Sequence, residues 1–339
     1  MQSGDGIRLS ELTTMRVGGP AGALITATTT DELVDAALEA WATDDWLVLG
    51  GGSNVVIADE GFDGTVIHVA TRGIERIDGD GVLLRVAAGE PWDGVVEHAV
   101  ANGWAGIEAL SGIPGTAGAA PIQNIGAYGQ ELSDVLVAID FLDQVTGERQ
   151  RILAEDLGLG YRMSAIKAGL EGVVLGIELR LEESAEGAIK YSQLAAALGV
   201  ESAPIAEIRE GVLRLRRSKG MVLDADDPDS AGCGSFFTNP IVGENFARSL
   251  PPATPQWLVD DTAVKVSAAW LIEEAGIGKG FRLPGSHVAI SSKHTLAITN
   301  RGDGTAEEVA QLARFIQAIV LARFGIALQV EPVAVGVEL

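Results

Sequence analysis

The sequence lacks several features that would place a protein in a particular class. It has one cysteine, Cys233, among 339 residues, so no intrachain disulfide can form and a reducing compartment is expected. Its four histidines stand at no metal-ligand spacing with Cys233, so no metal site is expected. No run approaches the ~18 apolar residues that cross a bilayer, and residues 1–6 do not resemble a signal peptide. These absences predict a cytoplasmic protein with no membrane partner.

Basic residues are scarce, with 24 lysines and arginines against 47 aspartates and glutamates. The resulting formal net charge of −23 repels phosphodiester backbones, so nucleic acid is not expected as a partner. The same acidic excess is also typical of an ordinary soluble surface. Any anionic ligand must therefore be held by a few local basic contacts.

The pattern of apolar residues predicts a fold of mixed helices and strands. Hydrophobic residues make up 47% of the chain, which excludes wholesale disorder and indicates two or three domains at this length. Thr29 and Thr305 are each followed three residues later by glutamate, the spacing of a capping box at a helix start. Further helices are expected at 92–101 and 204–217, and strands at 46–49, 83–88, 136–142, 173–181 and 326–331, with another apolar run over 333–337. Residues 182–188 are predicted to be a loop and 220–234 an exposed connection.

Two glycine-rich segments are the strongest candidates for a cofactor site. Gly50–Asn54 directly follows the expected strand 46–49, and glycine lets successive backbone N–H groups approach a phosphate closely. It matches neither a Walker A loop nor a GxGxxG fingerprint, and alone it could equally be a tight turn. Residues 111–129 contain five glycines and almost no charge, which suits packing against a large flat ligand or a close-packed interdomain loop. Together the two segments favour a dinucleotide.

Three further residues carry little weight when each is taken alone. Ser235 has no GxSxG elbow around it and no assignable histidine and aspartate partners, so a hydrolytic nucleophile is disfavoured. An arginine such as Arg162, after a glycine-rich turn, is more often part of a surface ion pair. A glutamate such as Glu331, near the end of an expected strand, is most often a solubilising edge residue.

Taken together and in this order, these segments resemble the UDP-N-acetylenolpyruvoylglucosamine reductase family. The resemblance runs from about Thr14 to the C-terminus, and the run 111–129 is its most specific part. It implies an α+β fold, with a two-part FAD-binding fold of the vanillyl-alcohol-oxidase (PCMH) type and a C-terminal α+β substrate-binding domain. The implied domains are 1–72 with 327–339, then 73–205, and then 206–326.

The resemblance implies NADPH-dependent, FAD-mediated reduction of UDP-N-acetylglucosamine enolpyruvate to UDP-N-acetylmuramate in peptidoglycan precursor biosynthesis, by a monomer. Arg162, Ser235 and Glu331 match the family's catalytic residues. The substrate contacts implied are Tyr191, Lys219, Asn239 and His294, and Tyr191 marks the subtype whose tyrosine loop folds over the substrate diphosphate. The residues implied for the cofactor are Gly50, Gly51, Gly52, Ser53, Asn54, Val55, Ser111, Gly112, Ile113, Pro114, Gly115, Thr116, Gly118, Ala119, Ile122, Gln123, Asn124, Gly126, Ala127, Tyr128 and Arg216.

The sequence departs from the family's usual pattern in two places, and two other functions stay open. The segment between Lys219 and Ser235 is longer and more acidic than in some members of the family. The dipeptide Cys233-Gly234 is also not the usual sequence before the serine. A flavin oxidase or dehydrogenase of the same fold, acting on an alcohol or sugar, should consume oxygen readily. A non-enzymatic module that binds a sugar nucleotide should be colourless.

Overall fold

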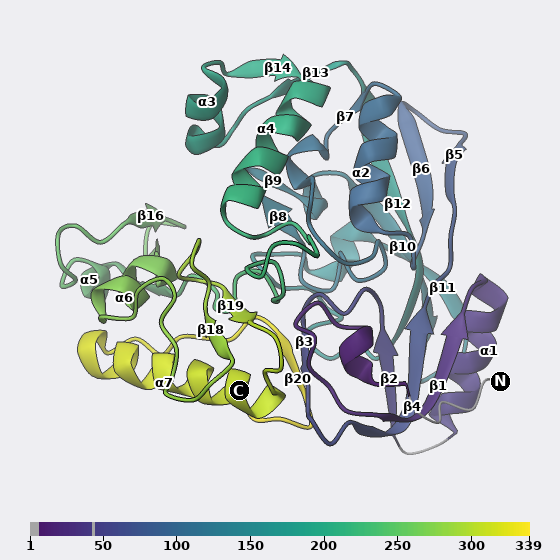
Figure 1. Cartoon of the computed structure of the whole chain (residues 1–339). Coiled ribbons are helices and arrows are strands. Elements are labelled where there is room, and N and C mark those ends of the chain that lie inside the picture. The colour runs from purple at the N-terminus through teal and green to yellow at the C-terminus, as the bar shows by residue number, and fades with distance from the viewer. Residues whose placement is uncertain (1–6, 43–44) are drawn as a thin grey trace. The chain divides into compact units, whose positions relative to one another are not determined.

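The chain forms two compact units, each of which is described by itself. The computed structural model describes residues 7–42 and 45–339 (Figure 1). Among these residues, unit 1 comprises Ala21–Gly51 and Asp63–Ser218, and unit 2 comprises Ile7–Pro20, Gly52–Phe62 and Lys219–Leu339. Unit 2 therefore joins two short N-terminal segments to the C-terminal third of the chain. The expected division into three domains stays a prediction.

Two sheets organise unit 1. One has the strand order β1-β4-β2, in which β2 runs parallel to β4 with Trp46 opposite Thr65 and Leu49 opposite His68. The other is antiparallel, in the order β11-β10-β12-β6-β5, and β7 pairs with the end of β12. Small two-stranded pairs β8-β9 and β13-β14 complete the described set. The bounds are β1 Ala21–Ala27, β2 Trp46–Leu49, β4 Phe62–Val69, β5 Ile74–Ile77, β6 Val82–Ala87, β7 Trp104–Ala105, β8 Gly126–Ala127, β9 Gln130–Glu131, β10 Leu136–Asp143, β11 Arg149–Leu153, β12 Gly172–Glu183, β13 Glu186–Ala188 and β14 Ser202–Pro204.

The helices of unit 1 are α1 (Thr30–Trp41), α2 (Trp92–Ala101), α3 (Ser192–Leu198) and α4 (Ile205–Ser218), with 3₁₀ turns at Glu108–Leu110, Leu132–Asp134 and Ala154–Leu157. Helix α1 begins with the reciprocal capping box predicted at Thr29 and Glu32. Its apolar face buries Leu33 and Ala37 in one cluster with Ile67, which removes that face from water. The capping box therefore sets where the helix begins, and the apolar residues three and four positions apart set the face that it buries.

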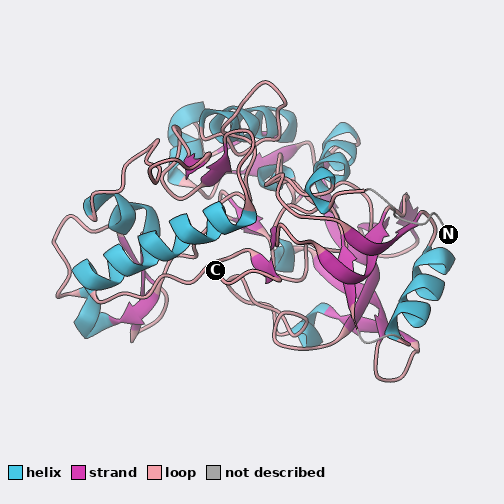
Figure 2. Ribbon diagram, turned by 60° about the horizontal axis from the view of Figure 1, so that its bottom comes forward, coloured by secondary structure: helices cyan, strands magenta, loops and turns pink. Residues whose placement is uncertain are grey.

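Unit 2 is built around its long C-terminal helix. Helix α7 (Ala306–Phe324) has 19 residues, a capping box at Thr305 and a left-handed Gly325 at its end (Figure 2). It buries Leu312 and Ile316 in one core with Leu271. Burial of each such side chain stabilises the folded state by about 1.5–3 kcal/mol. The other elements are η1 Leu9–Glu11, β3 Val55–Ile57, β15 Ile241–Gly243, α5 Glu244–Ala247, β16 Gln256–Leu258, β17 Ala263–Val266, α6 Ala268–Glu274, β18 Val288–Ile290, β19 Ile298–Asn300 and β20 Val333–Val335.

The pairing of β3 with β20 ties the N-terminal part of unit 2 to its C-terminal end. The two strands run parallel, with Val55 opposite Val333 and Ile57 opposite Val335. Strands β15, β17 and β16 form a small antiparallel sheet, and β18 pairs with β19. The segment that follows Gly51 is thereby fixed beside the chain that follows Glu331.

Most predicted elements are confirmed, and two expectations are wrong. Residues 182–188 are not a loop, because β12 continues to Glu183 against β7 and β13 pairs with β14. Their polar composition reflects exposure at sheet edges. Residues 326–331 are not a strand, because they make only an isolated bridge between Val330 and Phe237. The partner segment bends at residues 234–236, so no longer ladder forms. Across residues 7–42 and 45–339, no helix combines the length and apolar character needed to span a membrane.

Candidate functional site

The residues expected at the site are divided between the two units. Unit 1 holds Gly50, Gly51, Ser111, Gly112, Ile113, Pro114, Gly115, Thr116, Gly118, Ala119, Ile122, Gln123, Asn124, Gly126, Ala127, Tyr128, Arg162, Tyr191 and Arg216. Unit 2 holds Gly52, Ser53, Asn54, Val55, Lys219, Ser235, Asn239, His294 and Glu331. No group of three or more potential metal ligands occurs in the part of the chain that the structure describes.

Within unit 1, Gly50 and Gly51 pack closely against the glycine-rich run 111–128. A Cβ added at Gly50 would lie 2.5 Å from Thr116 Oγ1, and one added at Gly51 would lie 2.8 Å from the Gly115 Cα. Both distances are shorter than any ordinary contact, so a Cβ would displace the Thr116 side chain at Gly50 and the facing backbone at Gly51. Two runs of backbone N–H groups that are far apart in sequence are thus neighbours. This cradle of bare backbone fits a dinucleotide such as FAD.

The run 111–128 is wound into successive turns by its own backbone. Ala120 N donates to Thr116 O at 3.2 Å, Ile122 N to Ala119 O at 3.2 Å, and Ile125 N to Ala120 O at 3.1 Å. At its start, Ser111 is fully buried and its hydroxyl donates to Glu108 O at 2.7 Å. The run is also tied to the chain before it, because Ala117 N donates to Glu90 O at 2.9 Å and Gly118 N donates to Ala88 O at 2.8 Å.

Arg162 lies in a tight turn that aims its side chain at this run. Gly160 and Met163 exchange backbone hydrogen bonds, and Arg162 between them has φ +54°. Its Nη1 donates to Asn124 O at 3.2 Å and its Nη2 to Gly126 O at 2.9 Å. The planar guanidinium is therefore set in a fixed orientation by two backbone carbonyls of the glycine-rich run.

The Asn124 side chain fastens the same turn from the other side. Its Nδ2 lies 3.2 Å from Gly160 O, 3.1 Å from Glu131 Oε2 and 3.2 Å from Ser133 Oγ, while its Oδ1 accepts from Ser133 N at 2.9 Å. Asn124 is almost fully buried, with 1% of its surface exposed. Glu131 and Ser133 are thus part of the support of Arg162, and no motif in the sequence marks them.

Arg216 on α4 contacts the beginning of the glycine-rich run. Its Nε donates to Gly112 O at 3.1 Å, and the residue is 8% exposed. Burial lowers the pKa of the Arg216 guanidinium, an effect that Tyr128 and Asp93 partly offset. The Tyr128 ring meets the ring of Tyr191 edge-on, with centroids 5.4 Å apart. Unit 1 therefore brings Arg216, Tyr128 and Tyr191 to the same region.

In unit 2, Ser235 and Glu331 lie on neighbouring segments. Glu331 N donates to Phe236 O at 2.9 Å, and Phe236 N donates to Leu296 O at 2.7 Å. The carbonyl of Glu331 accepts from Asn54 Nδ2 at 3.2 Å. Glu331 itself and Phe236, the residue after Ser235, are therefore held by backbone hydrogen bonds. Asn54 of the expected cofactor set is joined to Glu331 of the expected catalytic set.

The unusual Cys233 is a buried structural residue. Its Sγ lies 3.5 Å from Val55 O, and burial raises the pKa of the thiol to about 12. The thiol therefore stays protonated and can donate to the Val55 carbonyl at neutral pH. It packs two positions before Ser235 and helps to hold that segment on β3.

His294 is a neutral side chain close to two lysines. Burial, followed by the charges of Lys219 and Lys279, lowers the pKa of His294 to about 4, against a weaker opposing effect of Glu273. Leu296 N lies 3.3 Å from His294 Nδ1, which makes this nitrogen the acceptor and places the proton on Nε2. The structure thus brings Lys219 and His294 together. The Asn239 side chain makes a different contact, in which its Oδ1 accepts from Ala268 N at 2.9 Å.

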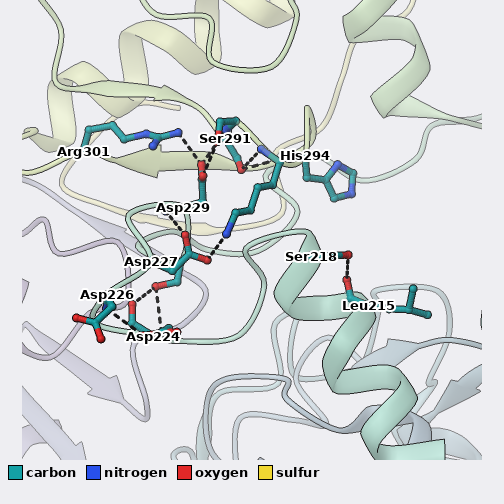
Figure 3. Close-up of polar contacts among 12 residues, drawn as sticks. Leu215, Ser218, Asp224, Asp226, Asp227, Asp229, Ser291, His294 and Arg301 are labelled. Carbon is teal, nitrogen blue, oxygen red and sulfur yellow. Dashed lines mark hydrogen bonds and ion pairs between the residues drawn. The ribbon is translucent and has the colours of Figure 1, made fainter.

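The acidic segment before Ser235 is only partly the exposed connection that was expected. Asp229 is 4% exposed and accepts from Ser292 N at 2.8 Å, Ser292 Oγ at 2.6 Å and Arg301 Nη2 at 2.6 Å. Lys293 Nζ binds Asp227 Oδ2 at 2.7 Å. Figure 3 shows the aspartates gathered beneath these donors. The charges of Asp227 and Asp229 are matched by donors in and beside the β18–β19 hairpin, so this part of the segment is anchored.

Comparison with known proteins covers nearly the whole chain. Residues 227–335 match the family UDP-N-acetylenolpyruvoylglucosamine reductase, C-terminal domain, and residues 21–152 match the family FAD binding domain. The chain is similar to proteins named UDP-N-acetylenolpyruvoylglucosamine reductase from Leifsonia xyli, at 52% identity over 98% of both chains, and from Salinispora arenicola, at 49% over 98% of this chain and 95% of that one. It is also similar to the crystal structure of the reductase of that name from Thermus caldophilus, with a TM-score of 0.68, 29% identity and 97% of each chain covered.

Proposed function

The chain belongs to the UDP-N-acetylenolpyruvoylglucosamine reductase family, and on this basis we propose that Arg162, Ser235 and Glu331 carry out its reaction. It is an FAD-containing oxidoreductase of peptidoglycan precursor synthesis, with an FAD-binding domain of the PCMH type and the family's C-terminal domain. Its substrates are NADPH and UDP-N-acetylglucosamine enolpyruvate, and its product is UDP-N-acetylmuramate. When bound, FAD would supply the hydride-transfer chemistry that links NADPH to the enolpyruvyl group.

Arg162 stabilises the negative charge that develops on the substrate. The enol ether is conjugated to a carboxylate, so hydride addition turns that group into an enolate. A guanidinium fork suits two carboxylate oxygens, and a fork already oriented needs little reorganisation as the charge forms. The observation that supports this role most directly is the fixing of Arg162 by the carbonyls of Asn124 and Gly126. Glu331 helps to stabilise this negative charge in its protonated form or through a water molecule, because an ionised carboxylate would repel it.

Ser235 then gives its hydroxyl proton to the carbon next to the carboxylate. The enolate carbon is a strong base, so a neutral hydroxyl suffices and no triad is needed around the serine. The absence of a GxSxG elbow in the sequence agrees with this role. Ser235 regains its proton from solvent when the product leaves.

The remaining assignments concern substrate and cofactor contacts. Lys219 is proposed to bind a substrate phosphate, Asn239 a substrate amide and His294 the wall of the substrate cleft; the position of Lys219 near the neutral His294 supports the first. Tyr191, 41% exposed and in contact with Tyr128, is proposed to cover the diphosphate, as in the tyrosine-loop subtype. The cofactor contacts of Gly50–Val55, of the residues named in the run 111–128 and of Arg216 are proposed likewise. The three-domain division, the monomeric state and the cytoplasmic location stay predictions.

A serine substitution separates the two half-reactions. Ser235→Ala should slow reoxidation of the reduced enzyme by the enolpyruvyl sugar by on the order of 10²–10⁴-fold, because the proton donor is lost. Reduction by NADPH should stay near the unaltered rate. Stopped-flow absorbance measures both, and Ser249→Ala, at an exposed serine after α5, is the control. If Ser235→Ala slowed both half-reactions equally, Ser235 would not be the proton donor.

A further inference from the structure

The two peptide groups that flank the Gly112 Cα are each held by a charged side chain. The Gly112 N–H donates to Asp93 Oδ1 at 2.6 Å, and the Gly112 carbonyl accepts from Arg216 Nε at 3.1 Å. Gly112 has φ +70°, a conformation that side chains disfavour. The first turn of the run 111–128 is therefore fixed by an acid from α2 and a base from α4.

Arg209 holds the carboxylate that receives this N–H. Its Nη1 binds Asp93 Oδ1 at 2.6 Å and its Nη2 binds Asp93 Oδ2 at 2.9 Å, a two-pronged contact that fixes the plane of the carboxylate. Arg209 and Arg216 are seven residues apart, which places them on the same face of α4 two turns from each other. One face of α4 thus acts on both peptide groups beside Gly112, directly through Arg216 and by way of Asp93 through Arg209.

The charges of this network support one another. Burial pushes the pKa of Asp93 upward, but hydrogen bonds from Arg209 and Gly112 and the charge of Arg216 leave it below its ordinary value. Burial likewise opposes the charge of Arg209, while Asp93, together with Glu97 and Glu210, raises its pKa. The Arg209 side chain is 11% exposed. The Asp93 side chain is 40% exposed, and a partly exposed pair of this kind adds little net stability, so its main consequence is a defined geometry.

We propose that Asp93 and Arg209 are positioning residues of the cofactor site, which help to hold the two peptide planes beside Gly112 in the orientation that receives FAD. The inference rests on the proposed contacts of residues 111–116 with FAD. Neither side chain is assigned a contact with the cofactor. Arg209 orients Asp93, Asp93 and Arg216 hold Gly112, and Gly112 sets the direction in which the following N–H groups point.

Titration of the apoprotein with FAD, followed by quenching of flavin fluorescence, tests the proposal. Arg209→Lys keeps the positive charge but cannot contact both carboxylate oxygens, and Asp93→Asn keeps an oxygen but removes its charge. Each should raise the Kd for FAD about tenfold, the effect expected for losing a hydrogen bond to a charged group. Arg149→Lys is the matched control, because Arg149 pairs with Asp140 at 2.7 Å on the exposed surface of the same unit; its Kd should be unchanged.

The titration is made at a temperature at which circular dichroism shows every apoprotein to be folded, so that a lower stability alone cannot raise the Kd. An Arg209→Lys Kd equal to that of the unaltered protein would overturn the positioning role and leave the proposed function intact. Should Arg209→Lys fail to fold, Asp93→Asn carries the same test, and an unchanged Kd there overturns the role. If the unaltered protein bound no FAD, the proposed function would fail as well.

Discussion

Among single residues, Arg162 adopts a backbone conformation that glycine favours. Its φ of +54° costs a residue with a Cβ roughly 1 kcal/mol. The turn from Gly160 to Met163, with Asn124 bound to Gly160 O, holds it there. A strained backbone at this arginine agrees with the proposed role of its guanidinium.

Replacing Arg162 by glycine and by alanine separates backbone strain from side-chain function. Arg162→Gly should have a free energy of unfolding about 1 kcal/mol higher than Arg162→Ala, because only glycine enters the left-handed region without a Cβ penalty. Both variants should lose turnover of the enolpyruvyl sugar. Urea unfolding measures the difference, and Met163, with an ordinary φ, should show the opposite order for the same pair. Equal stabilities of the two Arg162 variants would mean that the turn stores no strain.

The lowered pKa of His294 makes stability depend on pH. The unfolded chain takes up a proton near pH 6.5, whereas the folded protein does so only near pH 4, because burial and the charges of Lys219 and Lys279 outweigh that of Glu273. Stability from this group is therefore full above pH 6.5 and is lost as the pH falls from 6.5 towards 4.

His294→Asn keeps an acceptor for Leu296 N and removes the titration. Between pH 7 and pH 5 the unaltered protein should lose about 2 kcal/mol more unfolding free energy than this variant, since each pKa unit corresponds to about 1.4 kcal/mol. Urea unfolding at the two pH values provides the measurement. The same loss in both proteins would show that His294 is not buried in its neutral form.

At the level of whole elements, Gly50 and Gly51 act as one surface of unit 1 with the glycine-rich run 111–128. Gly51→Ala should force a Cβ to within 2.8 Å of the Gly115 Cα, so the segments must separate. We expect the Kd for FAD to rise by at least about tenfold and the unfolding free energy to fall by about 1–3 kcal/mol, the usual cost of overpacking. Gly278→Ala is the control, because nothing lies within 4 Å of a Cβ there. A Gly51→Ala protein with an unaltered Kd would remove this surface from the cofactor site.

The elements that the sequence predicts well are those whose signals are local. Capping boxes at Thr29 and Thr305 and the apolar faces behind them depend on residues three or four apart, and α1 and α7 begin where these signals place them. The prediction of a strand over 326–331 is wrong because a strand needs a partner, and the segment beside it bends at Ser235.

The same distinction applies to the candidate site. The glycine-rich segments are visible as local patterns, and the family resemblance adds Arg162, Ser235 and Glu331. Asp93 and Arg209 are 116 residues apart, and Asn124 contacts Gly160 across 36 residues, so no local pattern marks either contact. Supporting residues of this kind depend on tertiary packing and become visible only in the folded chain.

For the whole molecule, the excess of acidic residues makes the positive charges of Arg216 and Lys219 informative. Against a formal net charge of −23, Arg216 is buried beside Gly112 and Lys219 lies near a neutral His294. Local positive charge in a protein whose net negative charge repels anions suits a ligand that carries phosphates. Both FAD and a UDP sugar meet this description, which agrees with the family to which the chain belongs.

The most direct test of the function is an anaerobic visible absorption spectrum of the purified protein, recorded before and after addition of NADPH and then of UDP-N-acetylglucosamine enolpyruvate. We predict a flavin band that bleaches with NADPH and returns with the enolpyruvyl sugar. A band that bleaches but does not return would contradict the substrate. A protein that stays colourless even after incubation with FAD would contradict the account as a whole.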